Sequence, residues 1–224
     1  VSSRSGSADM LECLGMPLPL HEAAAVDCLQ ATNFTFLFAP AYHPAMKAVV
    51  PIRGALSVRT VFNVLGPLTN PAAPPYQLIG AYSKGAARLM AETLSGMPLE
   101  RAFVVHGEPG WDEATPAGDF VLYDVRPGSV VEETRSPGDY GLELCTPEAL
   151  QGGDAEHNAR ELVRVFPGDD KGAHRDALLR GTSLVLEVQG VAKDPVDGVA
   201  QAAAAIDDGR AESFLAELKA HFRN

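Results

Sequence analysis

The chain has 224 residues, of which 46% are hydrophobic, and it carries a formal net charge of -11. This length and apolar content are sufficient for one large α/β domain or two small ones. The negative charge disfavours nucleic acid as a partner, because phosphate backbones bind basic surfaces, and no apolar run reaches the roughly 18 residues that a membrane span requires. The cysteines, Cys13, Cys28 and Cys145, fit neither a zinc spacing nor a disulfide framework, which indicates a reducing, cytoplasmic environment.

The amino-terminal part is predicted to hold two helices and a strand. Residues 1–6 include neither an initiator methionine nor the apolar core of a signal peptide, so we interpret the chain as starting within a longer protein. A helix is expected from Ser7, as its N-cap, to residue 14, and another over residues 20–30. The apolar run 34–38 predicts a buried strand, and the prolines after it predict a loop over residues 41–43.

The middle of the chain alternates strand and helix patterns. The apolar segment 58–65 ends at Gly66-Pro67-Leu68-Thr69-Asn70-Pro71, a composition that predicts a fixed loop. Strands are expected over 77–82 and 102–106 with an amphipathic helix over 86–94 between them, an order that implies a right-handed parallel crossover. Farther along, residues 120–125 and 130–133 flank a turn and predict a β-hairpin.

The carboxyl-terminal third is predicted to be helical. Asp154 is placed to cap a helix, and helical patterns continue to residue 222 with interruptions near Gly168, Gly190 and Gly209. Together the elements predict a single α/β domain over residues 1–224, with a mainly parallel sheet flanked by helices.

Two glycine-containing segments precede helix starts and could take part in ligand binding. Ser2, Ser3 and Ser7 stand in a Ser/Gly segment at a helix start, where hydroxyls and backbone N–H groups suit an anion. The segment 152–158 has two glycines before a helix and allows close backbone approach. On composition alone, a disordered terminus for the first segment and an ordinary capped turn for the second are the favoured interpretations.

Two further sites could bind other parts of such a ligand. Asp112 and Glu113 follow the strand predicted over 102–106, and adjacent carboxylates there suit Mg²⁺ shared with a phosphate. Arg53 could form a planar fork with a carboxylate. A solvated acidic loop and a surface arginine remain open as alternatives. No Walker loop, G-x-G-x-x-G, H-E-x-x-H or G-x-S-x-G motif is present, so covalent nucleophilic catalysis has no evident candidate.

Four segments together resemble the anthranilate phosphoribosyltransferase family, in the family's order and spacing over essentially the whole chain. They read VSSRSGSAD from Val1, FAPAYHPAM from Phe38, RTVFNVLGPLTNP from Arg59 and GGDA from Gly152. The resemblance implies the fold of the nucleoside phosphorylase-type phosphoribosyltransferases, in an α/β catalytic domain whose upstream helical domain and pyrophosphate loop are absent. It also implies a homodimer in the full-length protein and predicts that this chain alone is inactive.

The resemblance implies a reaction in tryptophan biosynthesis. The amine of anthranilate displaces pyrophosphate from phosphoribosyl pyrophosphate (PRPP), giving N-(5-phosphoribosyl)anthranilate. The implied site residues are Ser2, Ser3 and Ser7 for PRPP, Arg53, Pro40 and Met46 for anthranilate, and Asp112 and Glu113 for Mg²⁺.

Two alternatives remain beside this reading. One is a related pyrimidine nucleoside phosphorylase, and the other is a non-enzymatic nucleic-acid-binding paralogue, against which the net charge argues. The sequence departs from the family's frequent pattern at Pro109 and Trp111 in the acidic loop, and at Arg180-Gly181-Thr182, where an Asn-Ala pair is frequent.

Overall fold

The computed structural model describes residues 5–43 and 62–223. This part of the chain forms two compact units, each built from separate stretches of sequence. The first comprises residues 5–43, 152–169 and 206–223, and the second comprises residues 62–151 and 170–205. The expectation of a single domain stays a prediction. Across these described ranges, no helix combines the length and apolar character that a membrane crossing needs.

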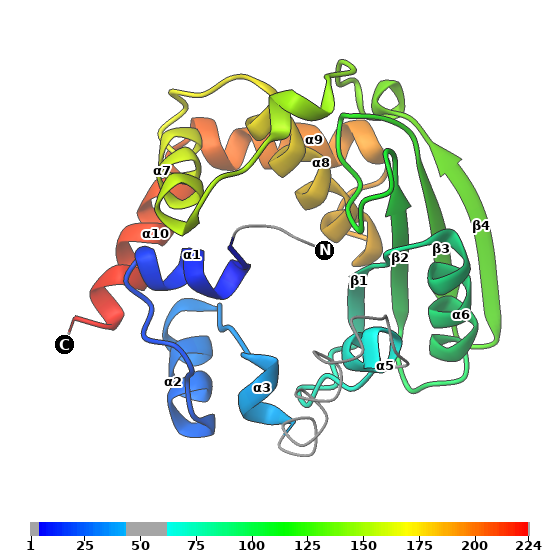
Figure 1. Ribbon diagram of the computed structural model, residues 1–224, viewed down its shortest axis with the longest axis horizontal. Helices are drawn as coiled ribbons and strands as arrows, with labels where there is room; N and C mark the ends of the chain where they lie inside the picture. Colours follow the sequence, from blue (N-terminus) through cyan, green and yellow to red (C-terminus); the bar gives the residue numbers. More distant parts are fainter. Residues whose placement is uncertain (1–4, 44–61, 224) are drawn as a thin grey trace. The chain divides into compact units, whose positions relative to one another are not determined.

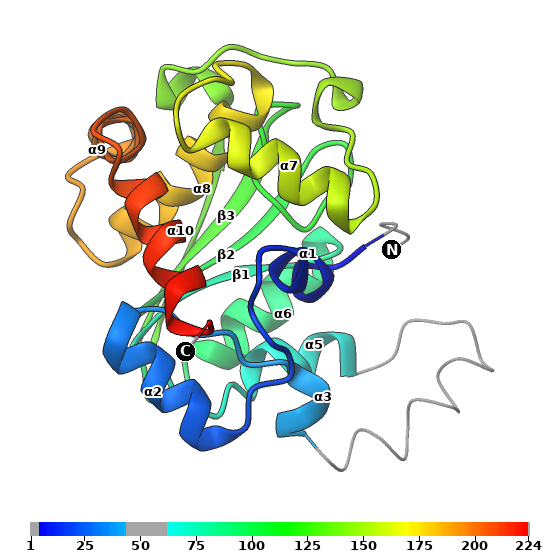
Figure 2. The ribbon, with the colours of Figure 1, turned by 90° about the vertical axis from the view of Figure 1, so that its left-hand side faces the viewer.

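The first unit is made of helices. The helix α1 (Ser7–Cys13) packs beside α7 (Ala155–Val165), and α2 (Glu22–Thr32) packs beside α10 (Arg210–His221), as Figure 2 shows. A single turn, α3 (Ala39–Tyr42), follows α2 in the chain. One buried cluster of this unit consists of Met16, Leu20, Ala25, Cys28 and Leu218.

The second unit contains a four-stranded sheet and the helices that cover it (Figure 1). Its elements are α5 (Phe62–Leu68), β1 (Tyr76–Gly80), α6 (Lys84–Leu94), β2 (Arg101–Gly107), β3 (Phe120–Arg126), β4 (Ser129–Arg135), the 3-10 turns η1 (Pro137–Tyr140) and η2 (Pro147–Leu150), α8 (Ala173–Val188) and most of α9 (Pro195–Asp207).

The sheet is mixed, with the strand order β1-β2-β3-β4. Strands β1 and β2 are parallel and are joined through α6, which confirms the predicted parallel strand–helix–strand connection. Strands β3 and β4 form the predicted antiparallel hairpin, and β2 also pairs antiparallel with β3. The α/β class is therefore confirmed, but "mainly parallel" was wrong for the described strands, because the connection from β2 to β3 is a loop that lets the chain turn straight back.

The two faces of the sheet pack against different helices because successive side chains of a strand point to opposite sides. Ala102 and Val104 of β2 share a buried cluster with α6 residues such as Met90. The alternate residues Phe103 and Val105 belong to a second cluster, which includes Leu184 and Val188 of α8. Nearly all of these side chains are fully buried, so strand β2 runs through the centre of the unit.

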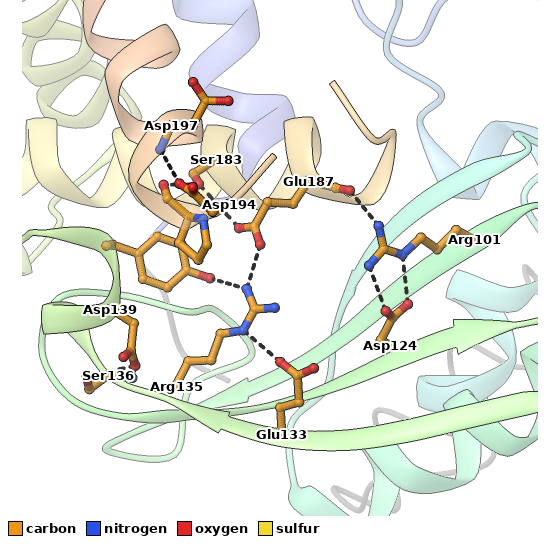
Figure 3. A network of polar contacts seen from close by, with 12 residues as sticks. Arg101, Asp124, Glu133, Arg135, Ser136, Asp139, Ser183, Glu187, Asp194 and Asp197 are labelled. Atoms are coloured by element: carbon orange, nitrogen blue, oxygen red, sulfur yellow. Dashed lines mark hydrogen bonds and ion pairs between the residues drawn. The ribbon is translucent and has the colours of Figure 1, made fainter. Parts of the chain in front are cut away.

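A network of partly buried ion pairs joins the sheet to α8 (Figure 3). Arg101 makes two hydrogen bonds to the Asp124 carboxylate, at 2.8 and 2.6 Å, and donates to the backbone oxygen of Glu187 at 2.7 Å. Arg135 of β4 donates to the Glu187 carboxylate at 2.8 Å and to the Tyr140 hydroxyl at 3.0 Å. The network therefore fixes α8 against three of the strands.

Several predicted elements are confirmed close to their expected bounds. The helix N-capped by Asp154 is present, and the Asp154 carboxylate accepts a hydrogen bond from the His157 N–H at 2.8 Å. Helices end near Gly168, Gly190 and Gly209 as expected. The predicted strands and helix between residues 77 and 106 correspond to β1, α6 and β2.

Three predicted segments have a different secondary structure. Residues 34–38 form no strand, because their apolar side chains instead pack against the cluster around Met16 and Leu218. Residues 66–68 continue the helix α5, since the φ angle of proline suits a helix, and the loop begins only at Thr69. Residues 41 and 42 also lie in a helix, α3, and not in the predicted loop.

The N-cap of α1 is Gly6 and not Ser7, which is the first helical residue. The Asp9 carboxylate accepts a hydrogen bond from the Gly6 N–H at 2.7 Å. This one-way contact from the Asp9 side chain restrains the start of the helix without the Ser7 hydroxyl.

Candidate active site

The acidic pair lies in the loop 108–119, which connects β2 to β3. Directly after β2, the N–H of Gly107 donates to the backbone oxygen of Trp111 at 2.9 Å, and the N–H of Trp111 donates back to Gly107 at the same distance. The N–H of Glu108 donates to the backbone oxygen of Asp119 at 2.9 Å and closes the base of the loop. The loop is therefore folded by its own backbone, and Asp112 and Glu113 stand just beyond its first turn.

The backbone of the acidic pair rests on the ends of the two parallel strands. Gly80 is the last residue of β1, and a Cβ atom there would collide with the backbone oxygen of Asp112. Gly107 is the last residue of β2, and a Cβ atom there would collide with the backbone oxygen of Glu113. Both positions require glycine because only an absent side chain leaves room for the loop. The acidic pair thus lies at the carboxyl ends of parallel strands, where α/β sheets bind ligands.

The Asp112 and Glu113 residues are both exposed to solvent. Partial desolvation of its carboxyl raises the pKa of Glu113, and the negative charge of Asp112 raises it further. No basic side chain contributes to that pKa, so the two carboxylates form a negatively charged pair that a cation would stabilise. Mg²⁺ binds one or two carboxylates and keeps waters or substrate phosphates as its other ligands, so the donor set fits this ion.

The far half of the same loop is held from α8 by Arg180. Its Nη1 atom donates to the backbone oxygens of Thr115 and Gly118, the latter at 3.3 Å. The side chain is fully buried, and its guanidinium lies over the rings of Phe120, 4.4 Å from the centroid, and Tyr140, 5.0 Å from the centroid. The acidic loop is therefore held at one end by the strands and at the other by this arginine.

In the first unit, the structure brings together the two glycine-containing segments that the sequence singled out. The Asn158 side chain of α7 donates to the Ser5 hydroxyl at 2.9 Å and accepts from the Gly153 N–H at 2.8 Å. Asn158 therefore ties the segment before α1 to the turn before α7. Ser7 is exposed in the first turn of α1.

The other predicted site residues are placed as follows. Pro40 is exposed in α3 of the first unit, whereas Asp112 and Glu113 belong to the second unit. Ser2, Ser3, Met46 and Arg53 lie outside the described residues. The PRPP and anthranilate assignments stay predictions.

Sequence reasoning did not find the residues that support the acidic loop. Gly80 and Gly107 were not singled out, although a glycine that ends each of two parallel strands was a usable signal. Arg180 was seen only as a departure from a family pattern. An arginine between apolar residues, Leu178-Leu179 before it and Leu184 one turn after it, could have been interpreted as buried.

Comparison with known proteins decides the family. A glycosyl transferase family, described by its a/b domain, matches residues 1–212. The chain belongs to this family. Among curated relatives in it, the anthranilate phosphoribosyltransferase of Rubrobacter xylanophilus is 44% identical over 96% of the chain, and that of Azorhizobium caulinodans is 44% identical over 97%. The chain spans about 63% of the length of each.

Similar solved structures agree with this assignment. The anthranilate phosphoribosyltransferase of Thermus thermophilus is 38% identical with a TM-score of 0.88, and the match covers 98% of the chain and 65% of that protein. The Saccharomyces cerevisiae enzyme, solved in complex with PRPP and Mg, is 26% identical with a TM-score of 0.89, and the match covers 98% of the chain and 63% of that protein. The same yeast enzyme has been solved in complex with 4-fluoroanthranilate. The resemblance seen in the sequence is therefore confirmed.

Proposed function

We propose that the chain acts in an anthranilate phosphoribosyltransferase. The reaction joins the amine of anthranilate to C1 of the ribose of PRPP and releases pyrophosphate. The observation that carries the proposal is the exposed Asp112–Glu113 pair, whose backbone packs against Gly80 and Gly107 at the carboxyl ends of two parallel strands. The chain that carries this pair is 44% identical to a curated anthranilate phosphoribosyltransferase.

The acidic pair would bind the diphosphate of PRPP through a metal. Asp112 and Glu113 would hold Mg²⁺, which neutralises charge on the departing pyrophosphate when it is bound. Their side chains repel a diphosphate without a cation between them, so binding of PRPP at this loop would require a divalent ion.

The remaining parts of PRPP would contact the amino-terminal segment. Ser3 and Ser7 would donate hydroxyl hydrogen bonds to phosphate oxygens, and Ser2 would contribute its backbone N–H. Asn158 would contribute indirectly, because it hydrogen-bonds Ser5, two residues before Ser7, as well as Gly153.

Anthranilate is an aromatic ring with a carboxylate, and two kinds of side chain are suited to it. Arg53 would bind the carboxylate with two parallel hydrogen bonds, which a planar guanidinium allows. Pro40 and Met46 would line an apolar channel for the ring. This arrangement orients the amine toward C1 of the ribose without a covalent bond to the protein.

Catalysis would come mainly from orientation and electrostatics. The aromatic amine is itself the nucleophile, so no serine or cysteine has to attack the sugar. Binding the two substrates next to each other in the reactive orientation converts a bimolecular reaction into an effectively unimolecular one. Preorganised N–H and hydroxyl donors would stabilise the negative charge that develops on the leaving pyrophosphate. A homodimer, a cytoplasmic location and the absence of nucleic-acid and membrane partners stay predictions.

One assay separates this function from its alternatives. Full-length protein is mixed with anthranilate, PRPP and Mg²⁺, and loss of anthranilate fluorescence is followed. The proposal expects a loss that requires both PRPP and the metal. A pyrimidine nucleoside phosphorylase would instead release free base from a nucleoside when phosphate is added. A nucleic-acid-binding paralogue would do neither and would bind single-stranded DNA at physiological salt.

A further inference from the structure

Arg180 is an unusual buried charge. It is the largest fully buried side chain among the described residues, and it has no ion-pair partner within that part of the chain. Its Nη1 atom bonds to two backbone oxygens of the acidic loop, while its Nε and Nη2 atoms have no hydrogen-bond partner in the described structure. Burial lowers the pKa of Arg180 to about 10, so the guanidinium remains charged at neutral pH.

A purely structural role does not explain this arrangement. A buried charge without an ion pair is costly, and an apolar residue of similar volume would pack between Phe120 and Tyr140 at lower cost. Elsewhere in the same unit, the partly buried arginines Arg101 and Arg135 both have carboxylate partners. The Arg180 guanidinium instead contacts the backbone of a loop that carries four carboxylates, at positions 108, 112, 113 and 119.

The geometry points to Arg180 as a positioning residue for the acidic pair. Its Nη1 atom fixes the backbone at Thr115 and Gly118, in the segment that follows Glu113. The loop is then held in one conformation before the metal arrives. This inference rests on the proposed function, because it assumes that Asp112 and Glu113 bind a divalent cation.

The requirement for arginine follows from its shape. One end of a planar guanidinium reaches two carbonyl oxygens that lie three residues apart, while its face packs against two aromatic rings. Lysine keeps the charge and can donate to the carbonyls, but it loses the planar stacking. Methionine keeps most of the packing but loses both the charge and the donors.

The chain contains its own reporter, because Trp111 is its only tryptophan and precedes Asp112 directly. We would titrate Mg²⁺, and separately Mn²⁺, into the wild type, Arg180→Met and Arg180→Lys while recording Trp111 fluorescence. The matched control is Arg101→Met, which removes a partly buried arginine that joins the sheet to α8 and directs its hydrogen bonds to Asp124 and Glu187 rather than to the loop. Hydrogen exchange of the loop 108–119 is measured in parallel, with the β3–β4 hairpin as internal reference.

The expected result is a dissociation constant for the metal that rises about tenfold or more in Arg180→Met, less in Arg180→Lys and not at all in Arg101→Met. Amide exchange in the loop should quicken in Arg180→Met while the hairpin remains protected. Equal metal affinity and equal loop exchange in the wild type and Arg180→Met would overturn the inference. If Arg180→Met does not fold, Arg180→Lys provides the test. Metal affinity and loop amide exchange equal to those of the wild type in Arg180→Lys would then refute the inference. No metal response in the wild type would instead refute the metal site of the proposed function, and the inference with it.

Discussion

Gly80, the last residue of β1, lies so close to the backbone oxygen of Asp112 that a Cβ atom on it would overlap that oxygen. Gly107 stands in the same relation to Glu113 at the end of the neighbouring strand. The backbone of the acidic pair therefore occupies the space that side chains at Gly80 and Gly107 would otherwise fill. The position of the two carboxylates thus depends on two glycines, which have no functional side chain.

Substituting Gly80 with alanine should displace the acidic loop. We expect Gly80→Ala to lower the free energy of unfolding by about 1–3 kcal/mol, the usual cost of overpacking, and to weaken PRPP binding in the presence of Mg²⁺. The control is Gly85→Ala in α6, where the new Cβ would meet no atom within 4 Å beyond its chain neighbours and the backbone of its own helix. That variant should be neutral or more stable by up to about 1 kcal/mol, because alanine favours the helix. Urea denaturation and calorimetry measure both effects, and equal behaviour of the two variants would contradict the close approach.

Breaking the ion pair between Arg135 and Glu187 should lower the free energy of unfolding far more than breaking a surface ion pair of the same length. Arg135 and Glu187 are 2.8 Å apart, with side chains 16% and 8% exposed. Arg88 and Glu92 are also 2.8 Å apart, but they are 68% and 55% exposed. We expect Glu187→Ala to destabilise the protein by about 3 kcal/mol, and Glu92→Ala to cost about 0.5 kcal/mol or less. Similar losses in denaturant unfolding would show that burial does not control the strength of these pairs.

Alkaline pH should destabilise the fold through Tyr140. Burial raises the pKa of Tyr140 to about 12, above the ordinary value of 10.0. Below pH 10 the hydroxyl is neutral in both the folded and unfolded chains, so its contribution is fully present. As the pH rises from 10 to about 12 the unfolded chain ionises first, and stability falls by about 2–3 kcal/mol. Comparison of the stability of the wild type and Tyr140→Phe across this range measures the effect, and an identical pH dependence would refute it.

Sequence reasoning succeeded where local chemistry decides the structure. The N-cap at Asp154, the β3–β4 hairpin and the β1–α6–β2 crossover follow from capping, turn residues and periodicity. It failed where the partner lies far away in the chain. The apolar run at 34–38 indicates burial, yet the neighbours that bury it are helices and not strands.

The candidate site shows the same division. The Asp112–Glu113 pair could be found from its place after a strand, and its meaning came from family resemblance. The contact of Arg180 with Thr115 spans 65 residues of sequence. No periodicity or spacing predicts such a contact, because it depends on how α8 packs on the sheet. The close approach of Gly80 to Asp112 is non-local in the same way.

Arg53 should determine the binding of anthranilate and not of PRPP. In the active full-length protein, we expect Arg53→Ala to raise the KM for anthranilate far more than the KM for PRPP, because only anthranilate offers a carboxylate to the guanidinium. Arg53→Lys keeps the charge without the planar fork and should recover only part of the affinity. Steady-state kinetics with each substrate varied in turn checks this, and equal increases in both KM values would remove Arg53 from the anthranilate site.

The central claim is that Asp112 and Glu113 bind the diphosphate of PRPP through Mg²⁺. Calorimetric titration of PRPP into the protein, with Mg²⁺ and with a chelator, tests it most directly. The control Asp119→Asn removes the same charge at the far end of the same loop. We predict tight binding only with Mg²⁺, a loss of at least tenfold in Asp112→Asn and Glu113→Gln, and little change in Asp119→Asn. PRPP binding that is equally strong with the chelator, or unaffected in Asp112→Asn and Glu113→Gln, would contradict the account.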